Sequence, residues 1–492
     1  MPLRGQKWGP TWGKESEVAK ETAGSPAAGA ERWRDHKRYL WVVALVMPLL
    51  PFFAIGLHQW TGLGVWLWLG PLVILGVVPI VDWTVGRDSA SVPDDMIAAL
   101  EGDRYYRWLT YAFLPLQYAG FIAGMFYIAQ GGLSTWESIG MAVTLGFIGG
   151  LGINTAHELG HKRDDHERWL SKIALAQCAY GHFFIEHNRG HHVRVATPED
   201  PASSRLGESF YRYWPRTVGG SLASAWRLER QRLTRRKGHA WRLRNDVLNA
   251  WLMTIVLWAA IIVLLGPSMI GYLLLQAFIG ITLLEAVNYL EHYGLLRQVV
   301  KHGDRERYER VEPRHSWNSN NVATNVLLYH LQRHSDHHAH PTRRYQALQD
   351  DAQAPVLPTG YSGMILLALV PPLWRRVMDP RVIAHYDGDA SLANIAPKKR
   401  QSIMTRYAHT APSSSVKPAI TDAGDSQVRP MMICSVKSAQ CPECGYVYDS
   451  AAGAVREGFA PGTPWSEVPD TWICPDCGVR DKSDFRPVAA RN

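Results

Sequence analysis

Six apolar runs of about twenty residues dominate the first three hundred residues of the chain. As a helix, about 20 apolar residues span the ~30 Å hydrocarbon layer of a bilayer, and helices in soluble cores are rarely this long and this free of charge. The runs therefore predict an all-α polytopic membrane protein with six transmembrane helices. They cover residues 39–57, 63–81, 109–129, 139–156, 247–265 and 269–290.

The distribution of lysine and arginine predicts how the helices are oriented. The short connections 58–62, 130–136 and 266–268 contain neither residue, whereas the N-terminal segment carries eight and the stretch 157–246 includes RLTRRKGHAWRLR. Because basic loops stay in the cytoplasm, we expect a multi-pass membrane protein with both termini and the long hydrophilic segments in the cytoplasm. The net charge of +8 then reflects topology and contact with anionic lipid, and nothing else in the chain favours nucleic acid as a partner.

Composition divides the chain into five segments. KETAGSPAAGAER is typical of a disordered leader, and HTAPSSSVKPAITDAGDSQ is typical of a flexible linker. No cleavable signal peptide is visible, because the first apolar run begins only near residue 39. We predict a disordered polar tail at 1–38, a membrane domain at 39–388, a linker at 389–432, a compact cysteine-bearing domain at 433–486 and a tail at 487–492.

Four of the six cysteines form two CxxC pairs, in CPECGYVYD and WICPDCG. These residues are Cys441, Cys444, Cys474 and Cys477. Four thiolates in this pattern form a tetrahedral metal site, and a reducing cytoplasm disfavours disulfides. The spacing alone leaves zinc and iron as alternatives.

Nine histidines are grouped in four motifs near the ends of the predicted helices. They are His157, His161, His187, His191, His192, His292, His334, His337 and His338. The i, i+4 spacing of His157 and His161 places both on one face of a helix, and His187 and His191 repeat it. All four motifs are expected on the same side of the membrane, which favours one shared site with its cap of helices in the cytoplasm. Nine imidazoles exceed what one metal ion binds, so we predict two.

Other polar residues near these motifs are expected to support the site rather than bind metal. They are His182, His330, His340, Glu158, Glu186, Glu285, Glu291 and Asp336. Such residues orient ligand imidazoles by hydrogen bonds or are simply solvated. We assign no separate catalytic acid or base. Imidazole binds zinc, copper, iron and nickel alike, so the ligands alone do not name the metal. If the cysteine site in the same chain carries one electron at a time, a redox metal is favoured at the histidines, and therefore iron.

The C-terminal segment resembles rubredoxin over its whole length. The matching motifs are CPECGYVYD, PGTPW, VPDTW and CPDCG. The resemblance implies one iron held by the four thiolates and cycling by one electron. It also implies a small aromatic core formed by Tyr446, Tyr448, Trp465, Trp472 and Phe485. Four basic and eight acidic residues lie between positions 433 and 485, so this acidic carrier would be steered toward the basic membrane domain.

The histidine motifs resemble those of the integral-membrane alkane 1-monooxygenases (alkane hydroxylases) over roughly residues 35–385. The matching motifs are NTAHELGHK, EHNRGHHVRVATPEDPASSRLGES, NYLEHYGL and LQRHSDHHAHPTRRYQ. The resemblance implies a di-iron centre held by the nine histidines, O₂ as co-substrate and hydroxylation of an alkane to a 1-alkanol. It implies electrons from rubredoxin, reloaded from NAD(P)H by a separate flavin-dependent rubredoxin reductase. Rubredoxin is usually a separate protein in that family, so its fusion here is the main departure.

Two alternatives remain at this point. A membrane fatty-acyl desaturase or hydroxylase would use the same di-iron core, but its usual partner domain, a haem carrier or ferredoxin, is not visible. A histidine-rich metal transporter with a zinc-ribbon tail would place its ligands in the middle of the bilayer, whereas these motifs lie at helix ends. Product analysis distinguishes the first alternative from alkane hydroxylation, because a desaturase forms an unsaturated acyl chain and an alkane hydroxylase forms 1-octanol from octane. Metal flux without catalytic turnover would identify the second alternative.

Overall fold

The computed structural model describes residues 33–302, 305–410 and 437–488. Within these residues, six helical segments are long and apolar enough to cross a membrane, which confirms the predicted fold class. Their bounds are Leu40–Thr61, Gly64–Val85, Arg104–Ala129, Thr135–Gly160, Asp246–Leu265 and Met269–His292. The predicted N-terminal tail up to residue 32, residues 411–436 and residues 489–492 lie outside the described part of the chain.

The first two spans are interrupted helices. Proline removes a backbone donor and disrupts a regular helix, and Pro48, Pro51, Pro71 and Pro79 lie within these spans. The first span consists of η2 (Leu40–Leu49) and α1 (Leu50–Thr61). The second consists of η3 (Gly64–Trp68), α2 (Leu69–Pro71), η4 (Leu72–Val77) and α3 (Val78–Val85).

The other four spans are continuous, and α6 is the central one. They are α5 (Arg104–Ala129), α6 (Thr135–Gly160), α11 (Asp246–Leu265) and α12 (Met269–His292). Helix α6 begins at a capping box formed by Ser134 and Glu137, and it packs against α5, α7 and α12. A Cβ at Gly146 would lie 2.6 Å from Ile279 Cβ. Glycine therefore allows α6 and α12 to approach closely.

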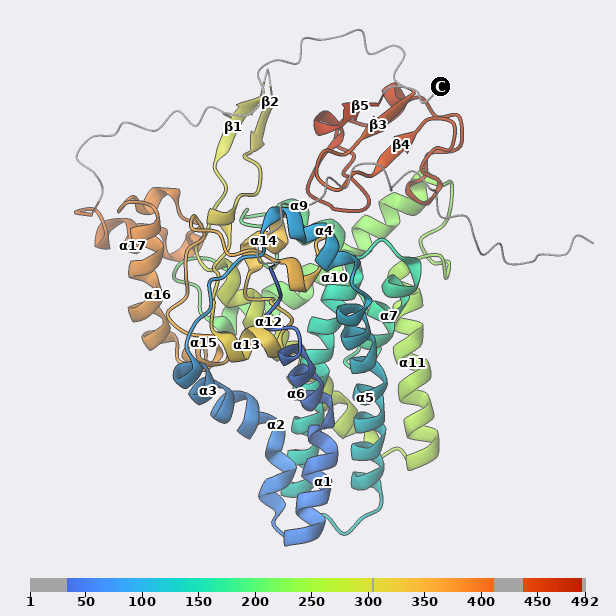
Figure 1. The fold of residues 1–492 in the computed structure, drawn as a ribbon, viewed down its shortest axis with the longest axis vertical. Coiled ribbons are helices and arrows are strands. Elements are labelled where there is room, and N and C mark those ends of the chain that lie inside the picture. Colours follow the sequence, from blue (N-terminus) through green and yellow to red (C-terminus); the bar gives the residue numbers. More distant parts are fainter. Residues whose placement is uncertain (1–32, 303–304, 411–436, 489–492) are drawn as a thin grey trace, which may run out of the picture. The chain divides into compact units, whose positions relative to one another are not determined.

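Further helices, most of them shorter, surround one end of this bundle. We call it the histidine end, because α6 and α12 stop there at Gly160 and His292. Figure 1 shows α9 and α14 near the upper ends of the long helices α5 and α6. The additional helices are α4 (Asp94–Gly102), α7 (Asp165–Ala176), α8 (Phe183–Glu186), η5 (His187–His191), α9 (His192–Arg194), α10 (Phe210–Arg235), η6 (Pro313–His315), α13 (Val322–Leu327), α14 (His334–Ala339), η7 (Tyr345–Ala347), α15 (Tyr361–Ala368) and α16 (Pro371–His385).

Two local features go beyond the sequence prediction. An antiparallel hairpin of β1 (Val299–His302) and β2 (Arg305–Tyr308) follows α12, where β-branched valines favour a strand. The first part of the predicted linker is also folded. It contains η8 (Ala390–Leu392), η9 (Pro397–Lys399) and α17 (Arg400–Arg406). Two of its apolar residues, Ile395 and Ile403, are buried.

The C-terminal domain is a small three-stranded sheet around an aromatic core. Strands β3 (Ser438–Gln440), β4 (Val447–Asp449) and β5 (Arg486–Pro487) have the order β4-β3-β5. Three short 3-10 helices complete it, η11 (Val455–Glu457), η12 (Trp465–Glu467) and η13 (Lys482–Asp484). Tyr448, Trp465, Trp472 and Phe485 are buried together and Tyr446 packs against them, as predicted.

Candidate metal centres

The two CxxC loops bring four sulfur atoms together inside the C-terminal domain. All four cysteines are buried, and their Sγ atoms lie within 4.8 Å of one another. The Sγ atoms of Cys441 and Cys477 are 3.8 Å apart, and those of Cys444 and Cys474 are 3.5 Å apart. Thiolates at about 2.3 Å from a tetrahedral metal ion lie ~3.8 Å apart. The four cysteines therefore fit one tetrahedrally bound ion.

The nine histidines predicted from the sequence also converge, and they do so in two separate groups. The five-histidine group contains His157, His161, His187, His192 and His337. The four-histidine group contains His191, His292, His334 and His338. All nine side chains are buried, and the candidate ligand atoms in each group lie within 4.8 Å of one another. Each group could hold a metal ion.

Distances between ring nitrogens fit this interpretation. In the five-histidine group, His192 Nε2 lies 3.0 Å from His187 Nε2 and 3.2 Å from His337 Nε2. In the four-histidine group, His334 Nε2 lies 2.9 Å from His338 Nε2 and 3.2 Å from His292 Nε2. Ligand nitrogens at about 2.1 Å from one metal ion and at right angles to each other lie ~3.0 Å apart.

The burial and protonation state of the rings also suit metal binding. Within the described residues, the buried Nε2 atoms of His157, His161 and His191 have no hydrogen-bond partner. Buried polar atoms without partners are costly, and a metal ion would satisfy them. Burial also lowers the pKa of most of these rings below the usual histidine value, so they are neutral and offer a lone pair. This holds for His161, His187, His192, His334, His337 and His338.

A π-helical turn decides which histidine joins which group. The i, i+4 spacing suggested that His187 and His191 share a face, but the structure pairs His187 with His192 instead. Residues His187–His191 form η5, a π turn in which the backbone N–H of His192 donates to the carbonyl of His187. That i, i+5 geometry brings His187 and His192 to one side. His191 then points into the other group.

Two carboxylates contact the four-histidine group. Asp200 Oδ2 accepts from His191 Nδ1 at 2.8 Å, and Ser203 Oγ donates to the same oxygen at 2.7 Å. A carboxylate in this position fixes the tautomer and orientation of a ligand ring. Glu291 Oε2 lies 3.3 Å from His334 Nε2. Sequence reasoning named Glu291 but missed Asp200, although it lies in the same quoted motif as His191.

The remaining acidic neighbours make contacts outside both groups. Glu158 pairs with Lys162 at 2.9 Å, Glu186 with Arg194 at 2.7 Å and Asp336 with Arg343 at 2.7 Å. Glu285 accepts from Tyr180 Oη at 2.7 Å and from Thr217 Oγ1 at 2.9 Å. These carboxylates support the helices that carry the histidines.

The three neighbouring histidines also lie outside both groups. His330 Nδ1 hydrogen-bonds to the carbonyl of Tyr345 at 2.9 Å. The ring of His182 packs against Tyr180 with 4.5 Å between centroids. His340 contacts Glu443 of the C-terminal domain.

An apolar cavity lies close to the histidines. Its lining includes Asn154, Val287 and Leu331, which precede His157, His292 and His334 by three to five residues in the chain. It continues along α6 and α12 past Gly150 and Leu283. Apolar atoms provide nearly all of the lining, so the cavity suits an apolar ligand and disfavours ordered water.

Charged side chains connect the C-terminal domain to the histidine end. Arg189 Nη2 lies 2.9 Å from Glu457 Oε1, and Arg168 Nη2 lies 3.1 Å from Asp476 Oδ1. Arg310 pairs with Asp481 at 3.3 Å and also with Asp484. Acidic residues of the carrier thus meet arginines of the membrane domain, as the charge distribution predicted. The particular arginines were not identified from the sequence.

Both cysteine loops reach residues next to the histidine groups. Glu443, between Cys441 and Cys444, contacts His340, two residues after His338. Gly478, directly after Cys477, is so close to the membrane domain that a Cβ there would lie 2.6 Å from the carbonyl oxygen of Asn188. The same Cβ would lie 3.7 Å from His192 Cβ. The second CxxC loop therefore lies against the segment that supplies histidines to both groups.

Comparison with known proteins defines the class. Residues 134–366 match the fatty acid desaturase family, and residues 438–485 match the rubredoxin family. With six helices long and apolar enough to cross a membrane and with clustered histidines, the chain is a membrane-bound oxidoreductase that carries its own rubredoxin domain.

Curated relatives define the family more narrowly. The chain is 43% identical to alkane 1-monooxygenase of Ectopseudomonas oleovorans, over 79% of this chain and 97% of the relative. It is 44% identical to alkane 1-monooxygenase of Acinetobacter baylyi, over 79% and 95% of the two chains. A xylene/toluene monooxygenase hydroxylase component of Pseudomonas putida is 24% identical over 68% of this chain and 89% of its own length. The chain belongs to the alkane 1-monooxygenase family.

Proposed function

We propose that the protein hydroxylates alkanes at a terminal carbon. In the overall reaction, an alkane, O₂, two electrons and two protons give a 1-alkanol and water. The observation that carries this proposal is the apolar cavity, whose lining includes residues three to five positions before three candidate ligands, His157, His292 and His334. Such a cavity matches a substrate that has no polar group to recognise.

The histidines, Asp200 and the apolar lining have different roles in this proposal. We propose that the nine histidines hold two irons, which supply the oxidising power that an unactivated C–H bond requires. Asp200 keeps the Nδ1 proton of His191 in place, so that Nε2 is presented to the metal. The apolar lining positions the chain and excludes water. Because alkane C–H bonds have no useful acidity, no residue needs to act as a base on the substrate.

We also propose that the rubredoxin domain delivers electrons within its own chain. The contacts of Glu457, Asp476 and Asp481 with arginines of the membrane domain support docking in cis. The contact of Gly478 with Asn188 and His192 supports electron entry through the η5 turn. A separate flavin-dependent reductase would reload the domain from NAD(P)H.

Iron content is expected to be three per chain. Purified protein should contain two irons at the histidines and one at the cysteines. The double substitution Cys474→Ser/Cys477→Ser should remove one iron and all reductase-driven turnover, because two oxygen ligands replace thiolates. Cys178→Ser is the matched control and should leave three irons, since Cys178 belongs to neither CxxC pair and is buried between α7 and α8, against Gly149 of α6 and Gly280 of α12. Elemental analysis with an assay of 1-octanol from octane measures both effects. A chain with zinc at the histidines and no turnover would contradict the proposal.

The histidine end is expected to face the cytoplasm of a bacterial inner membrane. Its support is the absence of lysine and arginine from the connections at the opposite end, such as 130–136. Alkaline phosphatase fused after Gly131 should be active, and the same enzyme fused after Asn492 should be inactive. Green fluorescent protein should give the reverse pattern. Equal phosphatase activity at both positions would disprove this orientation.

Desaturation of a fatty-acyl chain is the competing function, favoured by the family match of residues 134–366. Both reactions need the same metals, so the product decides between them. Octane and a palmitoyl thioester are supplied to the same preparation with reductase and NADH. Formation of 1-octanol supports alkane hydroxylation, whereas an unsaturated acyl product with no octanol would establish the alternative.

A further inference from the structure

A second cavity, which shares no lining residue with the apolar one, lies where α7, α10 and α11 meet at the histidine end. Four arginines line it, Arg232, Arg236, Arg244 and Arg456, together with one carboxylate, Asp246. Trp169, Leu243 and Leu252 provide its apolar lining. The proposed reaction uses none of these residues.

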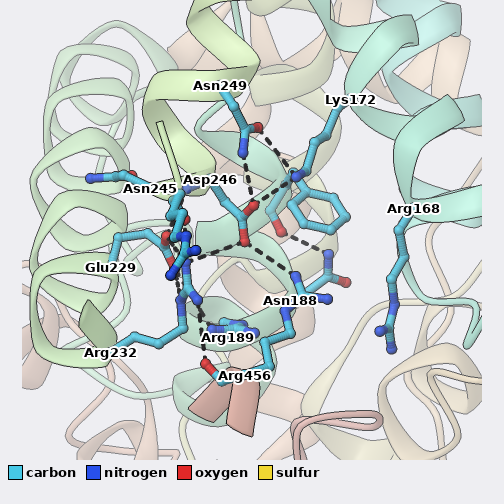
Figure 2. Close-up of polar contacts among 12 residues, drawn as sticks. Arg168, Lys172, Asn188, Arg189, Glu229, Arg232, Asn245, Asp246, Asn249 and Arg456 are labelled. Atoms are coloured by element: carbon cyan, nitrogen blue, oxygen red, sulfur yellow. Dashed lines mark hydrogen bonds and ion pairs between the residues drawn. The ribbon is translucent and has the colours of Figure 1, made fainter. Parts of the chain in front are cut away.

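The single carboxylate of this cavity is already neutralised. Figure 2 shows Asp246 at the centre of a polar cluster, with Lys172 and Asn249 pointing toward it. Lys172 Nζ lies 2.7 Å from Asp246 Oδ1, and Arg456 Nη2 lies 3.2 Å from Asp246 Oδ2. Arg232 is bound to buried Glu229 at 2.6 Å.

Two of the arginines remain available for another anion. Among the described residues, no ion pair or side-chain hydrogen bond is formed by Arg236 or Arg244. Guanidinium groups bind phosphate oxygens in a bidentate manner. The cavity therefore has a positive rim with two unsatisfied cations.

The position of the cavity along the membrane span identifies the source of the anion. Asp246 begins α11, a membrane-spanning helix, and Leu252 lies six residues further into it, about 9 Å along the axis. Leu252 is 42% exposed and Trp169 is 48% exposed. Tryptophan prefers the level of the lipid headgroups. One end of the cavity thus lies among the headgroups and the other faces hydrocarbon.

We propose that this cavity binds the phosphate of an anionic phospholipid. Arg236 and Arg244 hold the phosphate, and Trp169 and Leu252 contact the first part of the acyl chains. Because Arg456 belongs to the rubredoxin domain, the bound headgroup lies beside a contact between the two domains. The site is independent of the proposed reaction and stands whether or not the protein oxidises alkanes.

The test compares lipid binding by three full-length proteins. Wild type, Arg236→Gln/Arg244→Gln and Arg227→Gln/Arg230→Gln are purified, delipidated and titrated in native mass spectrometry with phosphatidylglycerol or phosphatidylcholine. Arg227 and Arg230 are exposed arginines of α10 that do not line the cavity, so the third protein is the matched control. The first phosphatidylglycerol should bind wild type and control roughly thirtyfold more tightly than phosphatidylcholine, since each arginine contributes about 1 kcal/mol near anionic lipid.

The Arg236→Gln/Arg244→Gln protein should lose this preference while keeping the iron content of wild type, which shows that it is folded. Two results would overturn the proposal. Either this protein retains the preference, or the control loses it equally and the effect is that of a general basic surface. Inorganic phosphate is added in a third arm. If it displaces phosphatidylglycerol at millimolar concentration, the site is one for free phosphate and the assignment to lipid is wrong.

Discussion

Replacing Gly478 with alanine should slow reductase-driven alkane turnover roughly tenfold while the rubredoxin iron is still reduced at the normal rate. The new Cβ would lie 2.6 Å from the carbonyl oxygen of Asn188, and a backbone atom cannot move aside cheaply. Overpacking of this kind costs about 1–3 kcal/mol, and each ~1.4 kcal/mol reduces the docked population tenfold. Stopped-flow absorbance follows reduction of the domain, and gas chromatography follows 1-octanol.

The chain contains its own control for this experiment. Gly445 follows the first CxxC pair as Gly478 follows the second, and both have positive φ, +71° and +70°. Alanine therefore causes similar backbone strain at either position. The nearest atom to a Cβ at Gly445 is Gln440 Nε2, within the same domain, at 3.5 Å. Gly445→Ala should thus leave alkane turnover unchanged.

An excess of separate wild-type rubredoxin should restore turnover in the Gly478→Ala protein, because only the docking of its own domain is impaired. If Gly445→Ala and Gly478→Ala slow turnover equally, the cause lies inside the rubredoxin domain and the docking contact has no role. If neither slows turnover, electrons enter elsewhere.

Filling the apolar cavity at Gly150 should shorten the alkanes that the protein accepts. Gly150 lies seven residues before His157, on the same face of α6 and about 10 Å from it along the axis. A Cβ there would lie 2.8 Å from Leu283 Cδ2, the flexible end of a side chain on α12, and 3.2 Å from the carbonyl oxygen of Gly280, which must give by only a few tenths of an ångström. Gly150→Ala should therefore be tolerated but should narrow the cavity. For alkanes long enough to pass this point, kcat/KM should fall roughly 10- to 100-fold.

The opposite change provides the control for cavity size. Leu283→Ala should extend the accepted chain length, and Gly150→Ala/Leu283→Ala should return it toward that of wild type. Competition within a mixture from hexane to hexadecane measures all three profiles at once. Iron content and hexane turnover should stay constant. A uniform loss across the series would show that Gly150 serves only helix packing and does not line the substrate path.

The features that could be predicted from the sequence are those encoded by local pattern. Hydropathy over about twenty residues identified six spans, and CxxC pairs identified the sulfur site. The i, i+4 spacing placed His157 and His161 together correctly, because α6 is a regular helix up to that point. Composition alone, however, assigned residues 389–410 to a linker, since two buried isoleucines are too few to change its average.

Features that depend on tertiary structure could not be predicted in this way. The pairing of His187 with His192 requires a π turn, which no simple spacing rule predicts. The role of Asp200 depends on the loop that returns it to His191. Docking arginines such as Arg189 and Arg310 come from segments far apart in sequence. One carboxylate or arginine among many carries no local signal of such a contact.

The η5 turn has a further consequence. His191 and His192 are consecutive, yet each serves a different histidine group. A single peptide unit therefore sets the separation and relative orientation of both sites. A change in the backbone at this position would move both groups together. Adaptation to new hydrocarbons is therefore expected through substitutions in the cavity lining rather than in the η5 turn.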